Sequence, residues 1–292
     1  MEQTLQHILR ELQTLRAELQ EVKQGIRPNQ QLVEAMLRRR GFCTLKHPLR
    51  HHLVLPLDCS KETANEFYHL MQKYSFRIFL RDLIAYSHTP NPDLLTRYCS
   101  AQTVQHYLAI LLQHHILRQI SPSGYEFTVG ADPMFGETLE WFVAQVLERE
   151  FASPASWGNL LKNSATGGDY DVIASVEGRL AYIEVKSSPP KHIDMPEVRA
   201  FVDRVQHLRP DFAIFLEDTH LRMQDKLAVM FAEEMQRRYG PAAQQEYPVR
   251  QVHHEIFAIK KIIFLTNTKP DLIANLAICL KTYFARGLTR EE

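Results

Sequence analysis

The chain has 292 residues, of which 45% are hydrophobic, so it is long enough to bury a sizeable core in roughly one to three domains. Its 34 basic residues balance 34 acidic residues, which excludes an overall charge that would attract polyanions. Contact with nucleic acid would therefore need a local basic surface.

Neither the cysteines nor the apolar segments indicate an extracytoplasmic protein. The four cysteines are scattered without a close pair, which is typical of reduced intracellular thiols and not of a zinc or redox motif. The first residues carry charge and lack the apolar core of a signal peptide. No apolar run approaches the roughly 18 residues that span a bilayer. We therefore expect a cytoplasmic protein that has no membrane contact.

The first 25 residues repeat apolar side chains at spacings of three and four. These are Leu5, Ile8, Leu12, Leu15, Leu19 and Val22. The spacing is that of the a and d positions of a coiled coil. Glu11 then faces Arg16, and Glu18 faces Lys23, in a parallel partner, which favours a homodimer. Leu9 at an e position leaves room for a higher oligomer, and a helix packed on its own domain is the alternative.

Basic side chains dominate residues 27–57. They are Arg27, Arg38, Arg39, Arg40, Lys46 and Arg50, against Glu34 alone. Such a run is either a solvated face or a surface that follows a phosphate backbone, and the sequence leaves both open. Arg38, Arg39 and Arg40 are weak candidates for nucleic-acid contacts.

Residues 76–129 predict three helices and a hairpin, in an order that resembles a winged helix. The helices are 76–86, 92–98 and 100–116, the last with Ser100 as N-cap, and the hairpin turns at Ser-Pro-Ser-Gly. The exposed residues of the third helix would be glutamines and a histidine, without Arg or Lys to grip phosphate or guanine. We therefore expect this unit to position a partner and not to read bases.

From residue 134 onward, helical and strand patterns alternate. Helices are predicted at 134–151, 196–208, 221–239 and 269–287, and strands near 170–177, 180–187, 212–218 and 256–267. This alternation indicates an α/β sheet that is covered on both faces.

Two strands of this region, DYDVIASV (169–176) and RLAYIEVK (179–186), form a predicted antiparallel hairpin. With a two-residue turn at Glu177-Gly178, Asp171 lies directly opposite Glu184, with their Cβ atoms about 4.5–5.5 Å apart. Lys186 shares that face, and the other face is apolar. Because Glu-Gly is a poorer turn than Asn-Gly, a three-residue turn with a bulge, which shifts the pairing by one, is the alternative.

Two opposed carboxylates repel each other, so this arrangement needs an offsetting interaction. One carboxyl group can stay protonated with a raised pKa, or a divalent cation can bind between the two. Paired oxygen ligands suit Mg²⁺, which also binds substrate phosphates. A lysine beside the ion can orient water and neutralise charge in the transition state.

An Asp, a hairpin turn and a strand that ends in Glu-x-Lys resemble the PD-(D/E)xK nuclease superfamily, which has the restriction-endonuclease-like fold. Asp171, Glu184 and Lys186 match its motif, although Tyr170 stands where the "PD" proline would be. The resemblance covers roughly residues 134–220. It implies a restriction-endonuclease-like mixed sheet flanked by helices.

The resemblance also implies further site residues. The carbonyl of Val185 would be a metal ligand, and an acid on the helix before the hairpin would reach the ion. Glu140 is our candidate for that acid, and Glu137 is the alternative. Gln206 is a weak candidate on the following helix. Apart from the resemblance, Lys191 lies just past the second strand and is a weak candidate for phosphate contact, with plain solvent exposure as the alternative.

One charged neighbour of these residues has a more ordinary interpretation. Asp169 falls opposite Lys186 in the two-residue register. It would then hold the lysine in place.

Three domains follow: a coiled-coil oligomerisation helix (1–26), a helical, winged-helix-like domain (27–130) and a PD-(D/E)xK nuclease-like domain (131–292). The resemblance implies an endonuclease that depends on Mg²⁺ or Mn²⁺, with DNA favoured over RNA, in defence, repair or mobile-element biology. The sequence leaves open whether the protein needs an activating protein. The alternative is a non-catalytic nucleic-acid-binding or scaffold protein that keeps the nuclease fold.

Overall fold

The computed structural model describes residues 29–44, 52–56, 59–86, 95–121, 124–129, 132–162, 169–187 and 193–285. The predicted coiled coil at 1–26 lies outside these residues and stays a prediction. Within the described ranges no helix is long and apolar enough to cross a lipid bilayer.

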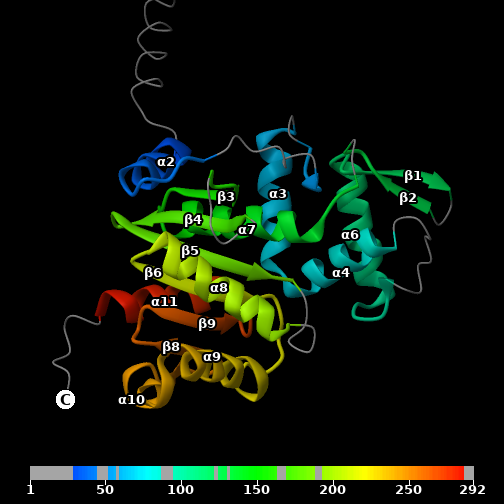
Figure 1. The fold of residues 1–292 in the computed structure, drawn as a ribbon. Helices are drawn as coiled ribbons and strands as arrows, with labels where there is room; N and C mark the ends of the chain where they lie inside the picture. Colours follow the sequence, from blue (N-terminus) through cyan, green and yellow to red (C-terminus); the bar gives the residue numbers. More distant parts are fainter. Residues whose placement is uncertain are drawn as a thin grey trace, which may run out of the picture.

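A seven-stranded mixed sheet forms the centre of the protein (Figure 1), in the order β3-β4-β5-β6-β9-β8-β7. Its strands are β3 (Ala155–Asn159), β4 (Tyr170–Val176), β5 (Arg179–Lys186), β6 (Phe212–Glu217), β7 (Val249–His253), β8 (Ile256–Ile259) and β9 (Ile263–Asn267). β5, β6 and β9 run parallel to one another, and every other neighbouring pair is antiparallel. The predicted mixed α/β sheet is thus confirmed.

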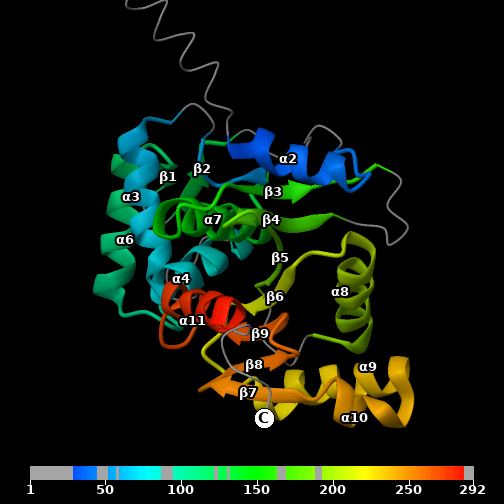
Figure 2. The same cartoon turned by 90° about the vertical axis from the view of Figure 1, so that its left-hand side faces the viewer.

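Helices cover both faces of this sheet, as predicted. One face packs against α7 (Phe135–Glu150) and α11 (Leu272–Ala285). The opposite face packs against α2 (Asn29–Arg39), α8 (Met195–Leu208) and α9 (Val229–Tyr239). Figure 2 shows α7 and α8 on opposite sides of the strands. Burial on both faces explains why the strands read as nearly continuous apolar runs.

The β4–β5 hairpin has the register that the two-residue turn predicts. Val176 pairs with Arg179, and Val172 pairs with Ile183. Glu177 and Gly178 both have positive φ, 48° and 73°, as a type I′ turn requires. The alternating apolar residues of the two strands face α7 and its core, so the alternative with a three-residue turn is excluded.

A helical layer precedes the sheet in sequence and lies beyond α7. It consists of α3 (Lys61–Gln72), α4 (Tyr74–Ala85), α6 (Ala101–Gln113) and the hairpin of β1 (Leu117–Ser121) and β2 (Gly124–Phe127). Ser100 caps α6 as predicted, because its side chain accepts a hydrogen bond from Thr103 N. The predicted helix at 92–98 lies partly outside the described residues.

The buried apolar core runs without a break from this helical layer into the sheet. Phe67 of α3, for example, contacts Trp141 of α7, with ring centroids 5.7 Å apart. α2 lies instead on the other face of the sheet, with Val33 and Leu37 in the same buried core as residues of α8 and α9. The domain boundaries at 26 and 130 stay a prediction, and the packing across residue 130 is continuous.

Three parts of the sheet region differ from the predictions. Residues 256–267 form two antiparallel strands, β8 and β9, and not one strand, because Lys260 and Lys261 adopt positive φ of 51° and 52° and turn the chain. β3 and β7 were not predicted. The helix predicted at 221–239 begins as a π-helical segment, η3 (Gln224–Ala228), before α9.

Candidate active site

Asp171 and Glu184 face each other where the backbone pairing of β4 and β5 ends. Val172–Ile183 is the outermost backbone pair, and the two acids lie one position beyond it. There a side chain replaces the backbone as the hydrogen-bond acceptor between the strands, since Oδ2 of Asp171 accepts a hydrogen bond from Val185 N at 2.7 Å. Side chains of β5 alternate between faces, so Lys186 lies on the same face as Glu184.

Glu184 is 1% exposed and accepts from three neighbours. Lys186 Nζ lies 2.8 Å from Oε1. Arg204 Nη1, from α8, lies 3.0 Å from Oε1 and 2.9 Å from Oε2. The Tyr182 hydroxyl donates a short hydrogen bond to Oε2. These donors offset the negative charge that burial would otherwise make costly.

Burial and the neighbouring acid raise the pKa of Asp171 well above its usual range. Desolvation is the largest cause, and the charge of Glu184 adds to it, while the hydrogen bond from Val185 N opposes both. Burial lowers the pKa of Lys186, but the charge of Glu184 and its hydrogen bond outweigh this and raise it overall. Lys186 therefore keeps its proton and acts as a cation.

Glu140 reaches the same region from α7. The residue is 9% exposed, and its Oε2 is buried without a hydrogen-bond partner among the described residues. Gly158 of β3 leaves room beside this oxygen, since a Cβ there would lie 3.9 Å from it. Burial first, and then the charges of Asp171 and Asp169, raise the pKa of Glu140.

Glu137, the alternative acid on α7, also has a buried Oε2 without a partner within the described part of the chain. Burial raises its pKa, and its charged neighbours are His52 and Asp169. For Glu140, in contrast, burial and then the charges of Asp171 and Glu184 raise the pKa. Of the two acids, Glu140 is therefore the one that shares its surroundings with the hairpin carboxylates.

These oxygen donors fit a divalent cation only in part. The partnerless oxygen of Glu140 and the raised pKa of Asp171 both indicate a site where positive charge would be stabilising. Glu184 is already engaged by Arg204, Lys186 and Tyr182. In the described ranges, no three His, Cys, Asp or Glu side chains are arranged to hold an ion together. Glu184 would have to exchange a partner before it could bind a metal.

Other predicted residues lie elsewhere or have other partners. Lys186 pairs with Glu184 and Glu197, and the described ion pairs include none between Lys186 and Asp169. The Gln206 amide is hydrogen-bonded to Tyr239 and Arg238, so the described contacts do not bring it to the site and its role there stays a prediction.

The weak candidates for phosphate contact also differ from one another. Arg38, Arg39 and Arg40 are all exposed at the end of α2, where Arg38 forms a 3.3 Å ion pair with Glu34 and Arg40 a 3.0 Å ion pair with Asp211. Lys191 lies outside the described residues. The three arginines thus present an exposed basic surface in which Arg38 and Arg40 are each paired with an acid.

Arg204 is the site residue that the motif did not reveal. It lies seven residues after Glu197 on α8, which places both side chains on one helix face. Glu197 lies 3.7 Å from Lys186 and Arg204 contacts Glu184, so this face covers the hairpin carboxylates. The seven-residue spacing of Glu197 and Arg204 on the helix after the motif was the sequence signal that could have indicated this contact.

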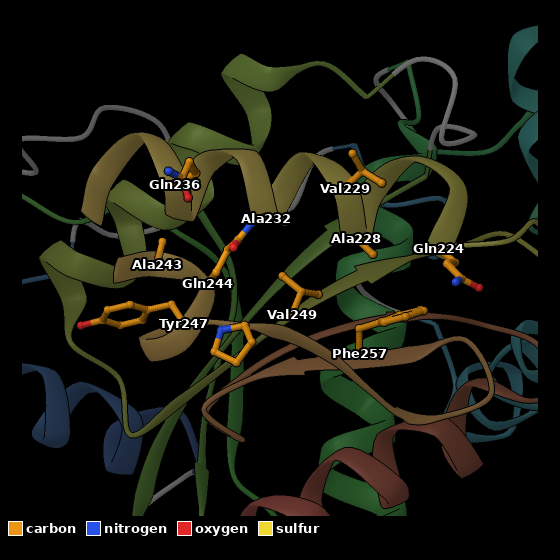
Figure 3. Close-up of a pocket in the computed structure, with 11 residues that line it drawn as sticks. Gln224, Ala228, Val229, Ala232, Gln236, Ala243, Gln244, Tyr247, Val249 and Phe257 are labelled. Carbon is orange, nitrogen blue, oxygen red and sulfur yellow. The ribbon is translucent and has the colours of Figure 1, made fainter. Parts of the chain in front are cut away.

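A separate cavity of about 370 Å³ lies between α9 and β8 (Figure 3). Ala228, Val229, Tyr247 and Phe257 line it together with amide side chains, and no carboxylate does. In the sheet, β8 is separated from β5 by β6 and β9. This cavity therefore contributes nothing to the carboxylate site.

No family model and no curated protein matches the chain. Protein VC1899 from Vibrio cholerae is 15% identical, with a TM-score of 0.47 over 69% of this chain and 55% of its own. Can2 from Sulfobacillus thermosulfidooxidans, solved in complex with cyclic tetra-adenylate, is 15% identical, with a TM-score of 0.46 over 86% of this chain and 60% of its own. At this level of similarity we draw no conclusion from either protein.

Proposed function

We propose that the protein is a metal-dependent nuclease of the PD-(D/E)xK type that hydrolyses phosphodiester bonds, with DNA favoured over RNA. One observation carries the proposal: Asp171 and Glu184 meet across the end of the β4–β5 hairpin, and Lys186 shares their face. The partnerless oxygen of Glu140 beside Asp171 supports it. The restriction-endonuclease-like fold and a role in defence, repair or mobile-element biology belong to the proposal by resemblance alone.

Four residues would bind the metal ion. Asp171, Glu140 and Glu184, with the carbonyl of Val185, would hold the Mg²⁺ or Mn²⁺ ion. When bound, such an ion lowers the pKa of coordinated water and stabilises charge on phosphate oxygens.

Lys186 would act on the substrate and not on the ion. Its raised pKa keeps it protonated, so it would donate a hydrogen bond to the attacking water and to the phosphate, and would not accept a proton. The helical layer would position the nucleic acid.

A cleavage assay tests this function. The full chain is incubated with supercoiled plasmid, linear duplex, single strands, branched DNA and RNA, in Mg²⁺, Mn²⁺ or EDTA. Glu184→Ala and Lys186→Ala should each reduce metal-dependent cutting by about 100-fold or more. Glu126→Ala and Lys281→Ala, which remove exposed charges far along the chain from the motif, should cut like the wild type.

A second candidate function is a non-catalytic nucleic-acid-binding or scaffold protein that keeps the nuclease architecture. The Arg204–Glu184 ion pair favours it, because it neutralises the acid without a metal. In that case no substrate would be cut under any condition, and the wild type and Glu184→Ala would bind DNA equally. That outcome would contradict the nuclease proposal.

A further inference from the structure

Four hydrogen-bonding contacts surround the Glu184 carboxylate. Oε1 faces Lys186 and Arg204, and Oε2 faces Arg204 and Tyr182. An ionised carboxylate offers about four lone-pair sites. The acceptor capacity of Glu184 is thus already filled by protein donors, and a cation could bind this carboxylate only by displacing one of them.

The three donors differ in how firmly they are held. Tyr182 is completely buried, and its ring packs between Tyr170 and Phe201 at centroid distances of 5.2 and 5.7 Å. Lys186 lies on the same strand as Glu184, two residues away, so its backbone stays beside the carboxylate even when its side chain turns towards water or substrate. Tyr182 cannot leave Glu184 without a change in the core, and Lys186 cannot move far from it.

Arg204 is the donor that can leave. Its two hydrogen bonds to Glu184 both come from Nη1, so it does not use the parallel two-nitrogen geometry that binds a carboxylate most strongly. Its Nε is buried without a partner among the described residues, which is a cost that the present position does not offset. It comes from α8, a separate element, and its side chain is 15% exposed.

We propose that Arg204 is a latch on Glu184: it occupies this carboxylate in the metal-free protein, and a divalent cation must displace it. This inference rests on the proposed function and concerns its regulation. A guanidinium also repels a nearby cation, so Arg204 raises the metal concentration that the site requires. Once displaced, its two-nitrogen edge is free to bind a phosphate of the substrate.

The latch predicts opposite effects on metal binding and on substrate use. Without Arg204 the ion has no competitor at Glu184, so it binds more tightly. The substrate phosphate, in contrast, loses a ligand, so KM for DNA rises. A residue with only a structural role would not move these two quantities in opposite directions.

The experiment is calorimetric titration of the full chain with Mn²⁺, for the wild type, Arg204→Gln and Arg204→Lys. Arg199→Gln is the matched control, because it removes the same charge from the same helix at a residue that contacts Glu234 instead. We expect Arg204→Gln to bind Mn²⁺ about tenfold or more tightly than the wild type. The Mn²⁺ affinity of Arg204→Lys should lie between those of the wild type and Arg204→Gln, which keeps the proposal testable if the glutamine variant does not fold. The Mn²⁺ affinity of Arg199→Gln should equal that of the wild type.

Equal or weaker Mn²⁺ binding by Arg204→Gln would overturn the latch, and the nuclease proposal would stand if the wild type still cuts DNA. Tighter binding without cleavage of any substrate would support the latch and contradict the nuclease. An absence of Mn²⁺ binding in all variants would overturn both.

Discussion

Arg77 and Asp218 form a buried ion pair that joins the helical layer to the sheet. Arg77 lies on α4, and its Nη2 lies 2.9 Å from Oδ1 of Asp218, the residue that follows β6. The Arg77 side chain is 1% exposed and also donates to Met71 O at 2.7 Å. The backbone N–H of Asp218 donates to Lys186 O at 2.8 Å, so this pair ends beside the lysine of the candidate site.

Breaking this pair should destabilise the protein strongly. Arg77→Met leaves the Asp218 carboxylate buried without its counter-ion, which costs about 3–5 kcal/mol of unfolding free energy. Chemical denaturation measures the loss. Arg118→Met is the control, because its pair with Glu126 is 66% and 50% exposed and should contribute less than about 1 kcal/mol. Similar losses of unfolding free energy in both variants would show that the buried Arg77 pair contributes no more to stability than an exposed ion pair.

The pH dependence of stability should carry a contribution from Glu217. This acid ends β6 next to Lys186, is completely buried, and has no hydrogen-bond partner for either oxygen among the described residues. Burial is the main reason that its pKa rises from 4.5 to about 8, with Lys226 opposing the shift. The folded protein therefore holds this proton more tightly than the unfolded chain. The contribution of Glu217 to the free energy of unfolding is therefore greatest below the pKa that it has in the unfolded chain, and it is lost as the pH rises towards about 8.

Glu217→Gln removes this contribution. Relative to the wild type, the variant should gain about 1.4 kcal/mol of stability for each pH unit between about pH 5 and pH 7. Urea denaturation at several pH values measures the slope, and Glu233→Gln, an exposed acid on α9, controls for loss of charge. A difference that does not change with pH would show that Glu217 is ionised in the folded protein.

Asp171 should lower the stability of the metal-free protein. The raised pKa of this residue means that its ionised form is disfavoured beside Glu184. Asn can still accept the hydrogen bond from Val185 N, so Asp171→Asn in EDTA should stabilise the protein by about 0.5–2 kcal/mol. Mg²⁺ should stabilise the wild type, by about 2.7 kcal/mol at 100 times the Kd, and leave the variant almost unchanged. Thermal denaturation with and without Mg²⁺ measures both effects, and destabilisation by Asp171→Asn in EDTA would contradict the prediction.

The sequence predicted the β4–β5 hairpin well because its signals are local. Apolar alternation sets which face is buried, and the two-residue turn sets the register, so the Asp171–Glu184 opposition follows from the hairpin alone. The prediction of a single strand at 256–267 was wrong because it also relied on local signals. Two lysines gave no turn signal of the kind that Gly or Asn gives, and yet they turn the chain.

Long-range partners could not be predicted in this way. Arg204 reaches Glu184 only because the β5–α8–β6 connection folds α8 over the hairpin. Arg77 and Asp218 are separated by 141 residues, and no spacing rule links them. The motif thus identified Asp171, Glu184 and Lys186, whereas their charge balance depends on tertiary contacts.

The acid on α7 can be identified by a matched pair of substitutions. Glu140 and Glu137 lie about one turn apart, and each has a buried oxygen without a partner within the described residues. Besides burial, the charges of Asp171 and Glu184 raise the pKa of Glu140, whereas the charged neighbours that act on Glu137 are His52 and Asp169. Glu140→Gln should therefore weaken Mn²⁺ binding by about 10–100-fold, and Glu137→Gln by less than about threefold. Calorimetry on both variants decides between them, since the reverse order would make Glu137 the ligand and leave Glu140 as a buried neutral acid.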